Sequence, residues 1–370
     1  AHNVRFPNSL DEVQMLQSLG DSAFARYLLG CFWYSKRRYD EAVSCWRETL
    51  EKSPDYAPAH RLLGVYSWNK QQDATQALAY LQRAVALEPD NARFLFELDF
   101  LQKLLARPVH ERLTTLVERK AVVLKRDDLT AELLSLWNAS GHYADAAAIL
   151  DTRVFHPWEG GEGKITGQYL LNQLHRALQF IERGAFKQAT DCLKAALRYP
   201  DNLGEGRLPG QTDNDIWYLL GYCAEQAGDA QQAAEYYQLA RQGGSTLDAG
   251  RYYNDQPADY LFWQGIALRK SGNPAQAEQH FRHFIDWAAQ HRDDVPQVDF
   301  FAVSLPDLVV LDVSAQQRHL QHCLFIEALG HLGLGNVSAC QQRMQQLLQI
   351  NPAHDKAHLI RHALQSGIFS

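Results

Sequence analysis

Small side chains return along this sequence at two matching places, and this recurrence restricts the fold more than any other feature. Gly30 and Gly221 each follow a leucine within an apolar stretch, and Ala42 and Ala233 stand at the equivalent position further along. A residue without a bulky side chain lets two helices approach each other closely, while large apolar residues between such positions fill the space between pairs. The chain is therefore predicted to fold as a series of helical hairpins.

Glycine and proline mark where these helices end. Glycines such as Gly184 and Gly228 fall at the turn between two helices, where the positive φ that ends a helix favours glycine. Pro54 and Pro352 stop the second helix of a pair, since proline lacks the N–H and clashes with the preceding turn. The predicted repeats cover about residues 23–56, 57–91, 92–126 (degenerate), 127–155, 170–200, 214–242, 258–290 and 321–353.

This spacing is similar to that of tetratricopeptide repeats, whose paired helices stack on their neighbours. The predicted fold class is all-α: a right-handed α-solenoid of tetratricopeptide (TPR) helical hairpins with long ordered loop insertions. Residues 354–366 are expected to form a C-terminal capping helix that closes the stack. We expect a single superhelical domain over residues 1–370, and the missing initiator methionine favours a fragment of a longer protein.

Composition and charge exclude several classes of protein. Hydrophobic residues make up 46% of the 370 residues and charged residues 21%, which argues against a disordered chain. A net charge of −7, with both signs mixed along the chain, provides no footprint for nucleic acid. Apolar runs are short and no signal peptide opens the sequence, so no membrane partner is expected and the cytoplasm is the expected compartment.

No cofactor, metal or catalytic residue is expected from the motifs. The six cysteines lie far apart without a CxxC pair, which predicts free buried thiols. The dinucleotide, P-loop and nucleophile-elbow motifs are missing. His354, His358 and His362 share one face of the last predicted helix. Zinc is one interpretation of such spacing, but a solvated face of the capping helix is the favoured one.

Four connections between repeats are much longer than a turn, at residues 156–167, 200–213, 243–259 and 290–314. Loops of this length in a compact protein are usually functional or disordered, and these mix large residues with glycines and acids, which favours order. Each follows the second helix of a repeat, and equivalent connections of a solenoid emerge along one edge. We expect the loops to line one rim of the groove and to fill part of it.

These loop sequences, in this order between the repeats, resemble the C-terminal repeat region of the YphG-like family of long bacterial proteins of unknown function. The phrase HPWEGGEG at residues 156–163 is the most specific part of the resemblance, which extends from about the first repeat to the end. It implies that the chain is the helical repeat domain of a larger protein whose N-terminal region is related to sugar-handling β-rich domains. It implies no activity for the residues present.

The concave groove is the first candidate site, because the first helix of each repeat lines it in this fold. Tyrosine and tryptophan are enriched in binding surfaces, since they combine a large area with a polar group. The alternative is that several of them are core residues packed against the loops. The Lys and Asn residues of a basic carboxylate clamp are absent from these positions, so an acidic C-terminal tail is not the expected ligand. The residues predicted to face the groove are Phe24, Tyr27, Tyr34, Arg61, Trp68, Tyr218, Tyr222, Phe262, Trp263 and Arg269.

An acidic cluster in the loops is the second candidate, made of Glu159, Glu162 and Glu205 near Trp158 and Arg207. Two carboxylates beside an aromatic platform is the arrangement that a glycosidase needs. Glutamates flanked by glycine more often cap helices or accept backbone N–H groups that hold a loop. The structural interpretation of this cluster is the favoured one.

The predicted function is a non-enzymatic protein-interaction scaffold. Its aromatic groove would be presented to a peptide or to another domain of the same polypeptide, such as an N-terminal one. Tyr253 and Asp255 in the third long loop are further candidate contacts. The alternative is an accessory or carbohydrate-binding part of a sugar-active bacterial enzyme, motivated by Trp158 and its acidic neighbours.

Overall fold

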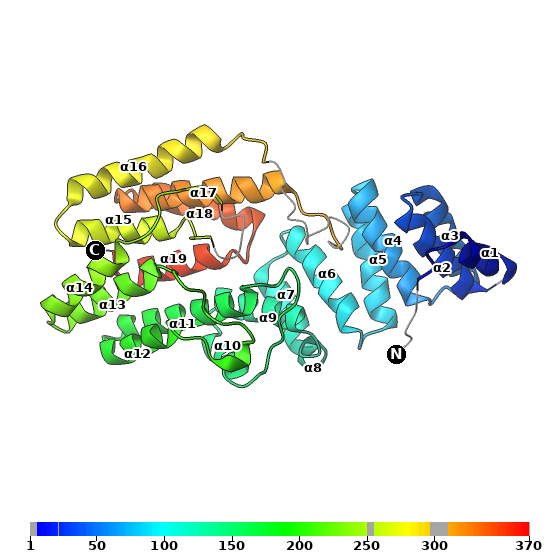
Figure 1. Cartoon of the computed structure of the whole chain (residues 1–370), viewed down its shortest axis with the longest axis horizontal. Helices are drawn as coiled ribbons and strands as arrows, with labels where there is room; N and C mark the ends of the chain where they lie inside the picture. The colour runs from blue at the N-terminus through cyan, green and yellow to red at the C-terminus, as the bar shows by residue number, and fades with distance from the viewer. Residues whose placement is uncertain (1–5, 21, 250–254, 297–309, 370) are drawn as a thin grey trace. The chain divides into compact units, whose positions relative to one another are not determined.

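The computed structural model describes residues 6–20, 22–249, 255–296 and 310–369. Within these ranges every regular element is a helix and no strand occurs (Figure 1). The predicted all-α fold of paired helices is confirmed. The chain divides into two compact units.

The N-terminal unit comprises residues 1–105, 120–129 and 305–313, and the C-terminal unit comprises residues 106–119, 130–304 and 314–370. The first residues of helix α9 (Asp127–Ala139) belong to the N-terminal unit and the rest to the C-terminal unit. The helices of the N-terminal unit are α1 (Leu10–Ser18), α2 (Ala23–Ser35), α3 (Tyr39–Lys52), α4 (Ala57–Tyr66), η1 (Ser67–Gln71), α5 (Ala74–Leu87), α6 (Ala92–Leu104) and α8 (Lys120–Val123). Those of the C-terminal unit are α7 (Val109–Glu118), α10 (Tyr143–Leu150), α11 (Lys164–Glu182), α12 (Phe186–Ala196), η2 (Asp201–Leu203), α13 (Asn214–Gln226), α14 (Ala230–Ala240), α15 (Tyr260–Lys270), α16 (Pro274–His291), α17 (Ala315–Gly333), α18 (Val337–Ile350) and α19 (Asp355–Gln365).

The pair α13–α14 shows how the small residues act. Gly221 on α13 faces Tyr237 on α14 so closely that an added Cβ would lie 2.6 Å from the Cε1 atom of the tyrosine ring. Gly228, with a φ of +81°, makes the turn between the two helices. Asp229 then caps α14 by accepting the N–H of Gln232, a standard way to satisfy a free N–H at a helix start.

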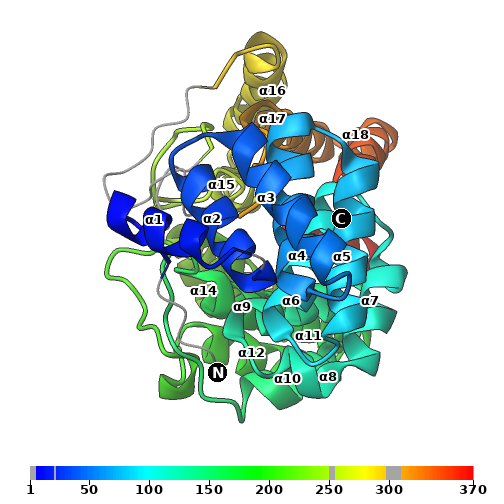
Figure 2. The ribbon, with the colours of Figure 1, turned by 90° about the vertical axis from the view of Figure 1, so that its right-hand side faces the viewer.

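The N-terminal unit uses the same packing. Gly30 on α2 lies against the indole of Trp46 on α3, and Ala42 is fully buried beside it. The pairs α2–α3 and α4–α5 lie side by side (Figure 2). The small residues predicted from the sequence therefore sit where two helices of a pair touch.

The first helix of the second pair ends in a wider turn. After α4 the backbone passes into the π-helical segment η1, and Gln72 closes it with a left-handed φ of +56°. Asp73 follows and caps α5 through the N–H of Gln76. Single turns of π-helix are rare and occur often at functional sites, and η1 carries Trp68, one of the predicted groove residues.

The last helix does more than close the row of pairs. Helix α19 packs along α11 as well as α18 (Figure 1). At its start the Asp355 carboxylate accepts hydrogen bonds from Ser135 of α9, at 2.8 Å, and from Gln168 of α11, at 2.7 Å. The C-terminal segment is thus held by the first helices of earlier pairs, which are the helices predicted to line a groove.

The prediction of a solvated histidine face on this helix is wrong. His362 packs parallel to the rings of Tyr143 and His175, with its Nε2 atom 3.3 Å from a Glu182 carboxylate oxygen. Burial lowers the pKa of His354 to about 4. The ring contacts with Tyr143 of α10 and His175 of α11 turn this face inward, because α19 lies on the repeats and not beyond their end.

Candidate functional site

Residues 310–312 lie against η1 within the N-terminal unit. The side-chain amide of Asn69 donates to the Val310 carbonyl, at 2.8 Å, and its Oδ1 atom accepts the N–H of Asp312, at 2.9 Å. The indole Nε1 of Trp68 donates to the Asp312 carbonyl, at 2.9 Å. We call this set of contacts the Asn69 site.

The Asn69 site recognises main chain. An asparagine amide offers one acceptor and two donors in one plane, and here it bonds as donor and as acceptor to the main chain of one short segment. Leu311, between the two bonded residues, is fully buried. Tyr34 also lies beside Asn69 and forms a hydrogen bond with it. Burial, and to a smaller extent the charges of Tyr39 and Asp312, raises the pKa of the Tyr34 phenol to about 12, although the hydrogen bond with Asn69 opposes this.

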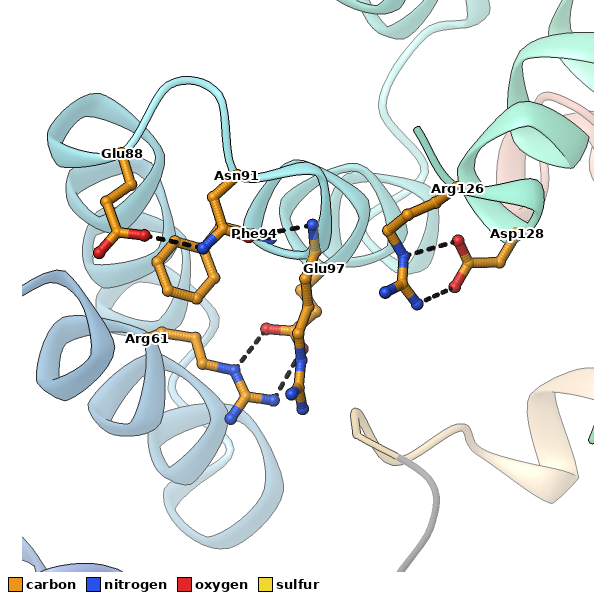
Figure 3. A network of polar contacts seen from close by, with 8 residues as sticks. Arg61, Glu88, Asn91, Phe94, Glu97, Arg126 and Asp128 are labelled. Atoms are coloured by element: carbon orange, nitrogen blue, oxygen red, sulfur yellow. Dashed lines mark hydrogen bonds and ion pairs between the residues drawn. The ribbon is translucent and has the colours of Figure 1, made fainter. Parts of the chain in front are cut away.

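Arg61, another predicted groove residue, has its charge engaged within the N-terminal unit. Its guanidinium binds both oxygens of Glu97 on α6, at 2.6 and 2.7 Å, and Arg93 binds the same carboxylate at 2.9 Å (Figure 3). The Glu97 side chain is only 2% exposed. Such a bidentate, buried pair fixes α4 against α6, so Arg61 is a structural residue here.

The remaining predicted residues of this unit differ in exposure. Tyr27 is buried, and its ring lies 5.2 Å from that of Tyr56 in an edge-on contact. Burial raises the pKa of the Tyr27 phenol well above its usual value. Phe24 is exposed. Trp68 is thus the groove candidate of this unit that bonds to residues 310–312, and Tyr34 bonds to Asn69 beside it.

In the C-terminal unit the predicted groove is occupied by the chain itself. Tyr218, Phe262 and Trp263 are at most 1% exposed. The Tyr218 hydroxyl donates to the Ile368 carbonyl, at 2.9 Å, and the Phe369 ring lies 5.4 Å from that of Phe262. The prediction that these three side chains face a groove is therefore corrected: they are core residues under the C-terminal segment.

Two further candidates of this unit also have internal contacts. Arg269 donates to the Gly333 carbonyl and lies 5.4 Å from the ring centre of Phe281. Tyr222 is half-buried on α13. Tyr253 lies outside the described residues.

The acidic loop residues do not form a glycosidase-like pair. Glu205 accepts the N–H of Gly163, at 2.9 Å, at the start of α11, and the Thr166 hydroxyl at 3.4 Å. Arg207 pairs with Asp213 and donates to the Leu197 carbonyl. These contacts hold the loops, as the favoured interpretation predicts.

Trp158 and Glu159 are placed apart from this polar arrangement. The Trp158 indole packs over Gly161, where an added Cβ would overlap it. Glu159 is exposed. Glu162, from the same loop, instead lies in the wall of a cavity.

That cavity, which we call the loop cavity, has a volume of about 790 Å³ and lies within the C-terminal unit. Parts of three long loops line it, through Glu162, through residues 205, 206 and 208–212 and through residues 255–257. Asp255, a predicted contact, is among them. The loops thus meet over the first helices α11, α13 and α15, with Lys356 of α19 in the wall.

An ion cluster lies at the base of the loop cavity. The Lys356 ammonium is 3.1 Å from an Asp259 oxygen and 3.9 Å from an Asp215 oxygen. Burial raises the pKa of Asp215, and the attraction of Lys356 only partly opposes this. Burial alone would lower the pKa of Lys356, but the two carboxylates outweigh it and the pKa is raised.

Sequence reasoning missed Asn69, Asp215 and Lys356. Asn69 directly follows the predicted groove residue Trp68, so its position near the end of the first helix of a repeat could have identified it as a candidate. Asp215 and Lys356 lie 141 positions apart in the sequence (356 minus 215) and carry no shared motif. Only the placement of α19 brings them together.

Metal binding and membrane insertion find no support in the described residues. Across the described ranges, no group of three or more His, Cys, Asp or Glu side chains is arranged to hold a metal ion. The six cysteines are free thiols. None of the helices in these ranges has the length and apolarity needed to cross a bilayer.

The match to a repeat family agrees with the helix pairs. The tetratricopeptide repeat family matches residues 33–92 and 174–249. Among solved structures, PilW, a widely conserved type IV pilus biogenesis factor, is similar over 58% of this chain and 90% of its own, with 16% identity and a TM-score of 0.30. The structure of Naa15/Naa10 bound to HypK-THB is similar over 97% of this chain and 58% of that chain, with 13% identity and a TM-score of 0.40.

Proposed function

We propose that this chain is a non-enzymatic protein-interaction scaffold whose N-terminal unit binds the main chain of a peptide at the Asn69 site. Tetratricopeptide repeats generally mediate protein–protein interaction. The observation that carries the proposal is the pair of hydrogen bonds between the Asn69 amide and the main chain of residues 310 and 312.

Main-chain recognition sets the kind of partner. Hydrogen bonds to a peptide backbone provide affinity without regard to sequence, and pockets for individual side chains provide selectivity. Here Leu311 is the buried side chain between the two bonded residues. The proposed partner is therefore a peptide segment with a branched apolar residue between two backbone positions that bond to Asn69.

The chain's own segment makes this binding competitive. A partner must displace residues 310–312, so its apparent affinity falls in proportion to the fraction of sites already filled. The same contacts also fit the interpretation that another domain of a longer polypeptide uses the site. In the first case the bound peptide belongs to a separate partner protein, and in the second it belongs to the same polypeptide.

Weakening the internal segment gives a direct test. Asp312→Pro removes the N–H that Asn69 accepts, and a labelled peptide of residues 309–314 then reports on the vacated site by fluorescence anisotropy. We expect Asp312→Pro to bind the peptide at least tenfold more tightly than the unaltered protein. Asn69→Ala in the Asp312→Pro background should abolish that gain, whereas Asn91→Ala, at the helix start of α6, should not.

Equal, weak binding by all four proteins would reject the proposal. Trp68→Phe distinguishes the contribution of the indole N–H from that of the aromatic ring, because phenylalanine keeps an apolar ring but has no N–H. A loss of several-fold in affinity is expected from the missing hydrogen bond to the Asp312 carbonyl.

A carbohydrate-binding accessory role in a longer sugar-active bacterial protein is the second proposal. The loop cavity supports it, because the resemblance to YphG-like proteins concerns the loops that line this cavity. Against it, Glu205 and Arg207 are already bonded within the loops. Titration with neutral oligosaccharides tests the role, and an unchanged affinity in Tyr260→Phe would place any sugar elsewhere.

A further inference from the structure

We propose that the cluster of Arg292, Arg343 and His331 around Glu327 binds a phosphate monoester group. The cluster lies entirely within the C-terminal unit and takes no part in the Asn69 site, so this inference goes beyond the proposed function. Two observations carry it: an excess of guanidinium groups over carboxylates, and buried nitrogen atoms that have no hydrogen bond.

Three consecutive helices bring these side chains together. Arg292 directly follows α16, and Arg343 lies on α18. Between them, Glu327 and His331 stand about one turn apart on α17, which packs against both of the other helices. Because each helix contributes to the cluster, it forms only in the folded chain.

Glu327 holds both arginines through the same oxygen. Its Oε2 atom accepts a hydrogen bond from the Arg292 guanidinium and lies 2.8 Å from Nε of Arg343. Its Oε1 atom is 3.9 Å from Nε2 of His331. The Glu327 side chain is only 9% exposed, against 35% for Arg292 and 26% for Arg343. The carboxylate is therefore the inner group, and the two guanidinium groups are the ones that solvent reaches.

The cluster carries an uncompensated positive charge. Both guanidinium groups stay protonated, and the single carboxylate balances one of them. Asp294, two residues after Arg292, is already bonded to His291, with 2.7 Å between its Oδ2 atom and the imidazole Nδ1. A partly buried positive charge left over in this way favours an anionic ligand.

Buried nitrogen atoms without a hydrogen bond are the independent observation. Nε of Arg292, Nε of Arg343 and Nδ1 of His331 are each buried, and none of them makes a hydrogen bond to a residue that the structure describes. Buried polar groups are normally bonded, and leaving them unpaired is costly. A ligand that offers oxygen atoms to these side chains removes that cost.

The number of side chains favours phosphate over carboxylate. Arg292, Arg343 and His331 approach from three helices, and a phosphate monoester offers three acceptor oxygens, whereas a carboxylate offers two. Arginine also binds phosphate through paired N–H groups. The Gln346 side chain accepts a hydrogen bond from Nη1 of Arg343, at 3.1 Å, and so helps to hold that guanidinium in place.

Fluorescence anisotropy of the full chain with a labelled phosphoserine peptide tests the proposal. The probe is a hexapeptide of alanine and glycine around one phosphoserine, and the controls carry serine or glutamate at that position. We expect saturable binding of the phosphopeptide, at least about tenfold weaker binding of the glutamate peptide and no binding of the serine peptide.

Competition with inorganic phosphate identifies the source of the phosphate group. Displacement of the probe at a phosphate concentration close to the Kd of the phosphopeptide indicates a small phosphorylated compound as the ligand. Displacement only at a much higher phosphate concentration indicates a phosphorylated protein segment. A complete failure of phosphate to displace the probe would contradict the proposal.

Matched variants separate binding from folding. Arg343→Gln should weaken the phosphopeptide about tenfold, whereas Arg318→Gln, at an exposed position of α17, should leave its affinity unchanged. Glu327→Gln should tighten binding several-fold, because it removes the carboxylate that competes for both guanidinium groups. A salt bridge with a purely structural role predicts no such gain.

A further variant covers the case in which a substitution prevents folding. If circular dichroism shows that Arg343→Gln or Glu327→Gln does not fold, His331→Phe replaces it and should weaken the phosphopeptide about threefold. Equal binding of the phosphoserine and glutamate peptides, equal effects of Arg343→Gln and Arg318→Gln, no gain in a folded Glu327→Gln protein, or no binding of the phosphopeptide at millimolar concentration would each overturn the proposal.

Discussion

The Nδ1 atoms of His175 and His362 lie 2.9 Å apart, although 187 positions separate the two residues. One of these atoms must accept a hydrogen bond from the N–H of the other, so both imidazoles cannot be cations at once. The Tyr143 ring stacks parallel to both, with 4.7 Å between its centre and that of His175. This contact fastens α19 to α11 and depends on neutral histidine.

Acid should therefore destabilise the C-terminal unit. Burial, together with the charges of His362 and His358, lowers the pKa of His175 well below its usual value. The unfolded chain then binds more protons than the folded one, so stability is complete above about pH 7 and falls as the pH drops through about 6.5. We expect a loss of about 2 kcal/mol at pH 5 for each such histidine, measured by urea unfolding at pH 7.5 and 5.

The matched control for this prediction is His110, which is exposed on α7. His175→Phe should reduce the difference between the two pH values, and His110→Gln should leave it unchanged. An identical pH dependence in both variants would contradict the role assigned to His175.

Neutralising Glu97 should destabilise the N-terminal unit. Glu97→Gln leaves the guanidinium of Arg61, which is 13% exposed, without its carboxylate partner (Figure 3). Breaking a buried pair from one side typically costs about 3 kcal/mol. Chemical denaturation measures this, with Glu88→Gln as the control, because Glu88 bonds to Asn91 at the surface and its change should cost below about 0.5 kcal/mol. Equal effects of the two substitutions would show that the Arg61 pair is not buried.

A methyl group on Gly221 should loosen the pair α13–α14. In Gly221→Ala the new Cβ would lie 2.6 Å from Tyr237, which forces a shift that costs about 1 to 3 kcal/mol. Gly167 in α11 has no atom within 4 Å of the same position, so Gly167→Ala should be neutral or stabilise by up to about 1 kcal/mol. Thermal unfolding compares the two, and a stable Gly221→Ala protein would mean that the pair packs less closely.

Shortening Ile368 should expose the residues predicted to line a groove. Ile368 is fully buried, and Ile368→Ala removes apolar contacts at a cost of about 2 to 4 kcal/mol. Val154→Ala, at an exposed position, should change stability by less than about 0.5 kcal/mol. Hydrogen exchange in α13 and α15 locates the effect, and unchanged exchange in these helices would contradict the assignment of Tyr218 as a core residue under the C-terminal segment.

How well the sequence predicted a candidate site depends on how far apart the residues of that site lie in the sequence. The loops were identifiable because their length and glycine content depart from the repeat pattern. Trp68 was identified by its place within a repeat, but its partner, the Asp312 carbonyl, lies 244 positions away. The prediction of an open groove failed for Tyr218 because a residue that would line a groove and a residue that packs under a returning helix have the same apolar pattern.

The amino-acid sequence by itself determined the helix pairs, because the contacts inside a pair join residues at short, regular separations, such as Gly221 and Tyr237. The tertiary structure alone decided where α19 and residues 310–312 go. Those segments are held by single long-range hydrogen bonds, ring contacts and buried charges, and such contacts leave no periodic trace along the chain. For this reason both the Asn69 site and the charged base of the loop cavity emerge only when the folded chain brings distant residues together.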